Sequence, residues 1–202
     1  MSSPLSTQDI KQIHDGIRDK YANVAVSPEG QFKYPTGRAG LEKLKYDAAI
    51  VSELPEAVAG SFCGVGNPFS LGEIPTGSRV LDIGCGAGVD ALVASKVVGP
   101  SGYVLGLDIT PEMIRRAEVN KKEIGAENVV FQVDRVQDLT GIEASFDVVI
   151  SNGAINLIPE KEEVIEAAFR LLKPGGRLFV ADQFLVGPTS KDMKARIQTW
   201  FQ

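Results

Sequence analysis

From residue 79 onward, short apolar runs alternate with segments in which apolar residues recur every three or four positions. The short runs are rich in valine, isoleucine and leucine, which favours buried strands, whereas the longer spacing is typical of amphipathic helices. We predict strands over residues 79–84, 103–109, 128–134, 146–152 and 177–186, and helices over 88–98, 110–125 and 159–176. Strands that alternate with helices form βαβ units. The pattern therefore predicts an α/β fold with a doubly wound, mainly parallel sheet that is covered on both faces.

The part of the chain before this alternation is less regular. Near the N-terminus its apolar residues lie mostly at helical spacings: Leu5, Ile10, Ile13, Ile17 and Tyr21. Ser6 or Thr7 can cap this helix, with Asp9 just after. We predict an amphipathic helix over 5–22, a glycine- and proline-rich loop over 27–40 and a short helix around 46–53. The expected organisation is a helical N-terminal extension or lid over 1–45, an α/β domain over 46–186 and a helical C-terminal tail over 187–202.

Composition and charge narrow the classes of protein. The chain has 202 residues, of which 44% are apolar and 23% charged, and its net charge is −5. An acidic balance does not favour nucleic-acid binding, and no apolar run approaches the roughly 20 residues that a membrane helix needs. The N-terminus lacks the features of a secretory signal, and two cysteines, Cys63 and Cys85, make no disulfide framework. We therefore expect a cytoplasmic protein without nucleic-acid or membrane partners and without a metal site.

The first strand of the alternation runs into a glycine-rich loop, LDIGCGAGVD (81–90). Its glycines, Gly84, Gly86 and Gly88, allow a tight turn and let a ligand approach the backbone ahead of the next helix. The dinucleotide-binding pattern would be G-x-G-x-x-G or G-x-G-x-x-A, whereas the order here is G-x-G-x-G. Asp82 precedes the loop and suits a ligand that carries a positive charge. A nicotinamide dehydrogenase is therefore a less favoured alternative.

Two further carboxylates end strands of the predicted sheet. Asp108 closes the second strand, where a carboxylate can accept hydrogen bonds from both hydroxyls of a ribose. Asp134 ends the third strand, where it could meet an adenine amino group. A helix cap or a solvated strand-end carboxylate is the alternative for each. Three strand-end carboxylates in register with a glycine loop favour a shared ligand site over three separate structural roles.

Three stretches resemble the class I S-adenosylmethionine-dependent methyltransferases: VLDIGCGAG (80–88), GLDITPEMIRRA (106–117) and LLKPGGRLFVAD (171–182). The resemblance runs from about Tyr46 to Asp182. It implies a Rossmann-like methyltransferase fold that binds S-adenosyl-L-methionine and releases S-adenosyl-L-homocysteine. The cofactor site that it implies consists of Asp82, Gly84, Cys85, Gly86, Gly88, Asp108, Ile109, Asp134, Arg135, Asn152 and Asn67.

Within this site, the resemblance assigns a part of the cofactor to each group. Asp82 and the glycine loop would hold the methionine end, and Asp108 would hold the ribose. Asp134 with Arg135 would meet the adenine. Asn152 would begin the loop under the transferred methyl group, so the polar end of the fourth strand is where cofactor and substrate are expected to meet.

Two stretches, GVGNPFSLG (64–72) and the segment 148–176, are similar to the arsenite methyltransferase branch of that family. Those enzymes bind trivalent arsenic through cysteine thiolates. The matching positions here are Val65 and Gly153, and Cys63 lies two residues from the first. Arsenite methylation is therefore an alternative and not the leading prediction. A glycine at position 153 would widen the pocket beside the methyl group, which favours an organic acceptor.

The leading prediction is a methyltransferase that uses S-adenosyl-L-methionine on a small-molecule acceptor. The alternatives are a cofactor-binding protein of this fold without turnover, and an arsenite methyltransferase. Candidate catalytic residues are Asn152, Gly153 and Tyr46. Tyr46 and Phe69 would lie against the methionine or the substrate, with core packing as the alternative. The only histidine, His14, would be a general base on a lid or, as favoured, a solvated or cap-associated side chain.

The chain after the last predicted strand is short for this family, whose sheet normally continues with another helix and a reversed hairpin. A helix is predicted from Ser190 to about Phe201, with an apolar stripe of Met193, Ile197, Trp200 and Phe201. The further C-terminal strands are therefore expected to be missing. Because a bare last strand tends to pair with another chain, a homodimer through the C-terminal edge or tail is a prediction.

Overall fold

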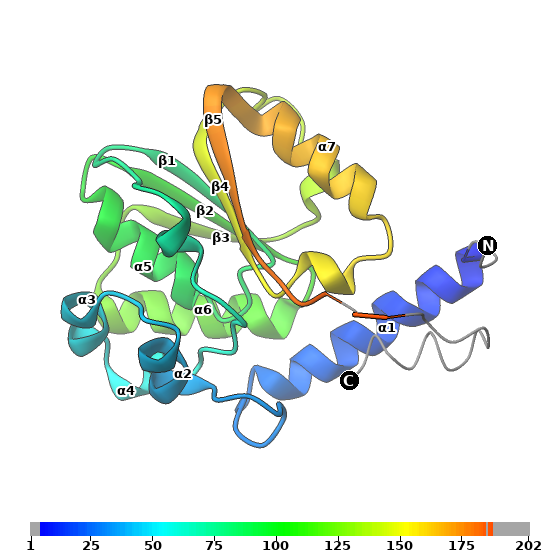
Figure 1. Ribbon diagram of the computed structural model, residues 1–202, viewed down its shortest axis with the longest axis horizontal. Helices are drawn as coiled ribbons and strands as arrows, with labels where there is room; N and C mark the ends of the chain where they lie inside the picture. Colours follow the sequence, from blue (N-terminus) through cyan, green and yellow to red (C-terminus); the bar gives the residue numbers. More distant parts are fainter. Residues whose placement is uncertain (1–4, 185, 188–202) are drawn as a thin grey trace.

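A single parallel sheet organises the fold. In the computed structural model, which describes residues 5–184 and 186–187, five strands form one sheet. The strands are β1 (Arg79–Ile83), β2 (Tyr103–Asp108), β3 (Val129–Val133), β4 (Phe146–Asn152) and β5 (Leu172–Ala181). All neighbouring pairs are parallel, and their order is β3-β2-β1-β4-β5 (Figure 1). The predicted doubly wound α/β sheet is confirmed.

Helices cover both faces of the sheet because alternate strand residues point to opposite sides. α5 (Val89–Val98) and α6 (Pro111–Ile124) lie on one face, and α7 (Lys161–Leu171) lies on the other (Figure 1). Ile150 of β4 is buried in the cluster that contains α5, whereas Val149 is buried in the cluster that contains α7. The central strands are therefore apolar on both faces, as their near-continuous apolar runs indicate.

Local sequence explains where two of the helices begin and end. α1 (Thr7–Val24) starts after Ser6, whose hydroxyl accepts a hydrogen bond from the backbone N–H of Asp9 at 3.2 Å. The Asp9 carboxylate accepts from the backbone N–H of Ser6 in return, at 2.8 Å, which completes a capping box. α6 starts with Pro111 and stops at Gly125, whose φ of 64° is left-handed. The predicted cap of α1 and both predicted limits of α6 agree with the structure.

Two boundaries near the C-terminal side of the sheet differ from prediction. The helix predicted over 159–176 ends at Leu171, because Pro174 has no backbone N–H and disfavours helix at the residue before it. Residues 172–176 belong to β5 instead, and that strand ends at Ala181, earlier than predicted. Pro174 and the glycines after it are signals that end a helix. The prediction overlooked them because it followed the helical spacing of the apolar residues alone.

The region before β1 holds more helix than its sequence pattern indicates. It contains α2 (Gly37–Lys43), α3 (Ala48–Glu53), α4 (Glu56–Ala59) and the 3-10 turn η1 (Pro68–Leu71). α3 corresponds to the predicted short helix, whereas the predicted loop over 27–40 was wrong from Gly37 onward. Two further 3-10 turns, η2 (Val136–Asp138) and η3 (Ile155–Leu157), follow β3 and β4.

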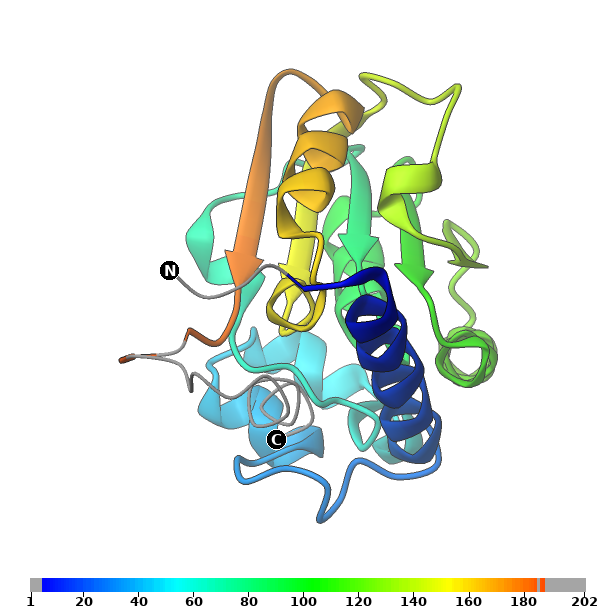
Figure 2. The ribbon, with the colours of Figure 1, turned by 90° about the vertical axis from the view of Figure 1, so that its right-hand side faces the viewer.

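The N-terminal helix lies across the end of the sheet toward which the strand arrows point (Figures 1 and 2). α1 buries Ile13 and Ile17, which pack with Leu157 of η3, and it also contacts α6. A helix from the start of the chain therefore covers the carboxyl ends of the strands. The limits of an N-terminal extension at residue 45 and of a tail at residue 187 stay predictions.

Two other expectations concern the tail and the membrane. The predicted helix over 190–201, with Met193, Ile197, Trp200 and Phe201, lies outside the described residues. Within the described part of the chain, no helix combines the length and the apolar character that crossing a bilayer requires.

Gly88 offers a test of the packing between the glycine loop and the layer around it. Its φ is 82°, and a Cβ there would lie 2.5 Å from Cζ of Phe131 and 2.9 Å from Cβ of Ala117. We expect Gly88→Ala to lower the unfolding free energy by about 2–4 kcal/mol, because backbone strain and overpacking add. Urea denaturation measures the change.

Gly125→Ala is the matched control for that substitution. Gly125 has a φ of 64°, and no atom lies within 4 Å of the place that a Cβ would take, so only backbone strain is expected there, about 1 kcal/mol. Equal losses of stability in the two variants would show that the close contacts of Gly88 do not matter.

Candidate functional site

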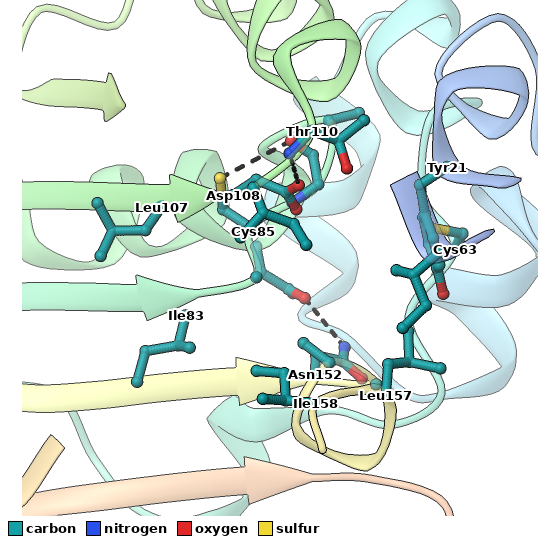
Figure 3. Close-up of a pocket in the computed structure, with 18 of the residues that line it drawn as sticks. Tyr21, Cys63, Ile83, Cys85, Leu107, Asp108, Thr110, Asn152, Leu157 and Ile158 are labelled. Atoms are coloured by element: carbon teal, nitrogen blue, oxygen red, sulfur yellow. Dashed lines mark hydrogen bonds between the residues drawn. The ribbon is translucent and has the colours of Figure 1, made fainter. Parts of the chain in front are cut away.

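A cavity of about 360 Å³ lies where the carboxyl ends of β1, β2 and β4 meet α1. Ligands of open α/β sheets bind at this edge, beyond the carboxyl ends of the strands. Figure 3 shows Ile83 and Leu107 on the strands, with Tyr21 and Cys63 together on the opposite side. The cavity therefore lies between the sheet and segments that come from the N-terminal part of the chain.

Most of the residues that the sequence singled out reach this cavity. Its lining includes Gly84, Cys85, Gly86, Asp108, Ile109, Asp134, Arg135, Asn152, Gly153 and His14. The predicted residues that are not part of the lining are Asp82, Gly88, Tyr46, Asn67 and Phe69. The structure thus brings the glycine loop and the strand-end carboxylates Asp108 and Asp134 to one wall.

The glycine loop holds Asp108 in a defined orientation. The backbone N–H of Gly86 donates to Oδ2 of Asp108 at 2.9 Å, and the backbone N–H of Thr110 donates to Oδ1 at 2.8 Å. Gly84, with a φ of 72°, passes so close to Ala154 that a Cβ would lie 2.3 Å from the alanine Cβ. The Thr110 side chain is a third hydrogen-bond partner of Asp108, so part of its acceptor capacity stays open, and burial raises the pKa of this carboxyl.

A third aspartate, Asp90, lines the cavity and was not predicted from the sequence. It lies in the first turn of α5, two residues after the last glycine of the loop, and that position was the available signal. Burial raises its pKa to about 6. Asp82, only 1% exposed, lies behind the cavity wall, and its Oδ2 has no hydrogen-bond partner. Burial, and then the charges of Asp90 and Asp108, raise the pKa of Asp82 well above its usual range.

These three carboxylates concentrate negative charge at the mouth of the glycine loop. In the part of the chain that the structure describes, no ion pair with lysine, arginine or histidine reaches Asp82, Asp90 or Asp108. Buried charge without a partner is costly, and a cation removes that cost. The electrostatics of the site therefore favour a positively charged ligand group.

Tyr46 and Asn67 are not part of the cavity lining. The Tyr46 side chain is buried, and its ring packs edge-on against Phe62 and Phe69, with centroid separations of 5.3 and 5.8 Å. Asn67 donates to the carbonyl oxygen of Lys45 at 2.9 Å and accepts from the backbone N–H of Phe69. Its side chain therefore joins the segment before α3 to the start of η1. For Tyr46 and Phe69 the structure matches the alternative of core packing that the sequence left open.

The surroundings of Gly153 differ from the sequence interpretation. Gly153 lines the cavity, but a Cβ built on it would point at Val65, 3.2 Å from Cγ1. Its φ of 69° also disfavours a side chain. The space that a side chain would take is therefore already filled by Val65, and the expected widening of the pocket is not what this glycine provides. The two positions compared above with arsenic ligands are neighbours in space.

α1 supplies a wall that the sequence reasoning largely missed. Ile17, Arg18 and Tyr21 line the cavity together with His14, whose Nε2 lies 3.1 Å from Oε2 of Glu160. Only His14 was considered from the sequence; it lines the cavity, its side chain is 25% exposed, and it contacts an acid. No local pattern distinguishes cavity-facing from core-facing residues of an amphipathic helix.

Neither cysteine has the character of a reactive thiolate. Burial raises the pKa of Cys63 to about 12 and that of Cys85 well above its usual range. Thiols with raised pKa values stay protonated and bind soft metals poorly. Among the described residues, no group of three or more His, Cys, Asp or Glu side chains is arranged to hold a metal ion.

Comparisons with known proteins agree on one family. The family described as a methyltransferase domain matches residues 74–202. An arsenite methyltransferase from Halobacterium salinarum is 35% identical, and the match covers 94% of this chain and 52% of that relative. A ubiquinone biosynthesis O-methyltransferase from Xanthomonas axonopodis pv. citri is 36% identical over 108 residues, which cover 53% of this chain and 44% of the relative.

A solved structure also indicates similarity to methyltransferases. The crystal structure of an arsenic(III) S-adenosylmethionine methyltransferase from Chlamydomonas reinhardtii superposes with a TM-score of 0.59 at 37% identity, over 68% of this chain and 50% of that one. The chain spans about half the length of the arsenite methyltransferases that it matches, 52% in the case from Halobacterium.

The buried carboxylate of Asp82, whose Oδ2 has no hydrogen-bond partner, predicts a specific effect on stability. Because its pKa is raised in the folded chain, the unfolded chain loses this proton first, so the unfolding free energy falls as the pH rises above the ordinary value of 3.8. We expect Asp82→Asn to raise the unfolding free energy of the ligand-free protein by about 1–3 kcal/mol near pH 8. The gap to the wild type should shrink at pH 5, as measured by urea denaturation.

Asp19→Asn is the control, because this exposed residue of α1 changes the net charge equally without touching the cluster. A stabilisation of the same size in both variants would reflect net charge alone. A loss of stability in Asp82→Asn would mean that the buried carboxylate is well compensated.

Proposed function

Because this chain belongs to the class I S-adenosylmethionine-dependent methyltransferases, near their arsenite methyltransferase branch, we propose that it methylates a small molecule. The observation that carries the proposal is the cavity in which the glycine loop, Asp108 and an acidic cluster converge. S-adenosylmethionine, the cofactor of this family, supplies an electrophilic methyl group on a sulfonium and leaves as S-adenosylhomocysteine.

The residues present fit that cofactor. Asp108 keeps acceptor capacity beyond its hydrogen bonds from Gly86 and Thr110, which suits a hydroxyl of a ribose. The unpartnered Oδ2 of Asp82 and the charge around it suit a ligand with a sulfonium and an ammonium group. We propose that Gly84, Cys85 and Gly86 lie along the methionine portion. In the same proposal Ile109, Asp134 and Arg135 lie around the adenine.

The acceptor would enter on the side formed by α1 and η3. The lining there is mostly apolar and includes Ile17, Tyr21, Leu157 and Ile158 (Figure 3). An apolar wall favours an organic acceptor, and it excludes water from the methyl transfer. Methyl transfer is an in-line displacement at carbon, so holding the acceptor at near-attack distance supplies much of the rate. The similarity to a ubiquinone biosynthesis O-methyltransferase supports an acceptor of this kind.

His14 is the residue available to remove a proton from a hydroxyl acceptor. It faces the cavity, and the contact of its Nε2 with Glu160 leaves the other ring nitrogen for a substrate. A base is required only where the acceptor must lose a proton.

Two alternatives differ from this proposal in ways that can be measured. Arsenite as the acceptor is less favoured, because Val65 and Gly153 carry no thiol and the Cys63 thiol stays protonated. Cofactor binding without turnover is the other. A single turnover from methyl-labelled S-adenosylmethionine onto candidate acceptors, arsenite included, separates the three. A cytoplasmic location, the absence of nucleic-acid and membrane partners, and a homodimer stay predictions.

Asp108 provides the direct test of cofactor binding. We expect the wild type to bind S-adenosylhomocysteine with micromolar affinity in calorimetry, and Asp108→Ala to weaken binding by about 10- to 100-fold, the loss typical of charge-assisted hydrogen bonds. The control is Asp19→Ala, an exposed carboxylate of α1 that is not part of the cavity lining. Absence of binding in the wild type would refute the proposed function. Unchanged affinity in Asp108→Ala would remove this residue from the site.

A further inference from the structure

Asp90 is held on the cavity wall by two side chains that come from distant parts of the sequence. The hydroxyl of Tyr46 donates to its Oδ1 at 2.6 Å, and Nδ2 of Asn152 donates to its Oδ2 at 2.9 Å. Asp90 is only 8% exposed, and that exposed part lines the cavity. A carboxylate oxygen accepts two hydrogen bonds, so each oxygen keeps one lone pair for a ligand.

Asn152 has no hydrogen-bonding capacity left for a ligand. Its Oδ1 accepts from the backbone N–H groups of Val65 and Gly66 at 2.9 and 3.0 Å. Its Nδ2 lies 2.8 Å from the carbonyl oxygen of Gly66 as well as 2.9 Å from Asp90. An amide has two acceptor positions and two protons, and protein groups occupy all of them. The loop also packs tightly here, because a Cβ on Gly64 would lie 2.3 Å from Nδ2 of Asn152.

Tyr46 is committed to the same carboxylate. Its side chain is 6% exposed and is not part of the cavity lining. Burial, and then the charge of Asp90, raise the pKa of the hydroxyl far above its usual value, so Tyr46 is a neutral donor at every accessible pH. Its single proton is directed at Oδ1 of Asp90, the shorter of its two acceptor contacts.

Of the two carboxylates at the glycine loop, only Asp90 faces the ligand space. Asp82 is on β1, buried on the side of α5, and it adds negative potential from behind the wall. From this arrangement we infer that Asp90 binds the ammonium group of the cofactor's methionine portion, and that Tyr46 and Asn152 are the residues that position it. The inference rests on the proposed function and names the contact on which recognition of the cofactor's amino group depends.

This assignment implies a pH dependence whose sign is defined. The titratable groups that interact with Asp90 are Tyr46, Asp82, Cys63 and Cys85. The tyrosine and both thiols have raised pKa values and stay neutral, which leaves Asp82, whose pKa is also raised, as the other carboxyl that titrates. Because the pKa of Asp90 is about 6, its attraction for an ammonium group weakens as the pH falls through that value.

The experiment compares two ligands that differ only in the amine. S-adenosylhomocysteine carries it, and 5′-S-(3-carboxypropyl)-5′-thioadenosine keeps the carboxylate and lacks the amine. In calorimetry at pH 8 we expect the wild type to prefer S-adenosylhomocysteine by about tenfold or more, and Asp90→Asn to abolish that preference. Tyr46→Phe should reduce it severalfold, whereas Tyr103→Phe, a matched change on β2, should leave it intact. Asp108→Asn should weaken both ligands alike.

A measurement on the wild type guards against misfolding of the variants. Its preference for the amine-bearing ligand should decline between pH 7 and pH 5, whereas the affinity for the analogue should stay flat. Equal weakening of both ligands in Asp90→Asn, or a preference independent of pH, overturns the assignment of Asp90 alone. A wild type that binds neither ligand overturns the proposed function and this assignment with it.

Discussion

The close approach of Asp82, Asp90 and Asp108 places negative charge at a point of the fold from which water is largely excluded. Backbone N–H groups, Tyr46 and Asn152 supply hydrogen bonds, but no cation of the described chain compensates the charge. Such a cluster weakens the ligand-free fold and strengthens the binding of a positively charged ligand. Stability and recognition are therefore linked through the same three carboxylates.

The parallel sheet makes this arrangement available. Because all strands run the same way, the loops after β1, β2 and β4 open at one edge, where the glycine loop, Asp108 and Asn152 meet. α1 then covers that edge and adds a wall of its own. The ligand space is thus built from a rigid sheet on one side and an N-terminal helix on the other, and the helix side is where acceptor specificity would reside.

Much of the fold follows from local signals. The alternation of apolar strands and amphipathic helices identifies the sheet, and Pro111 with Gly125 marks both limits of α6. The prediction is wrong where the apolar spacing continues past a residue that ends a helix. At Pro174 the helical spacing of α7 runs on into β5, so the helix was predicted too long. The short helices before β1 were partly missed as well, because segments of four to seven residues carry too few turns to show a period.

The sequence by itself determined the family, the glycine loop and the strand-end acids Asp108 and Asp134, since motif spacing and strand ends are local properties of the chain. Only the tertiary structure decided which polar side chains form hydrogen bonds within the protein and so have none left for a ligand. Asn152 was expected at the methyl group, and Tyr46 either against the ligand or in the core. Their hydrogen bonds to Asp90 span 62 and 44 positions of sequence. Contacts over such separations form only when the helices and the sheet pack together. Local spacing along the sequence therefore does not show which donors and acceptors meet in a buried site.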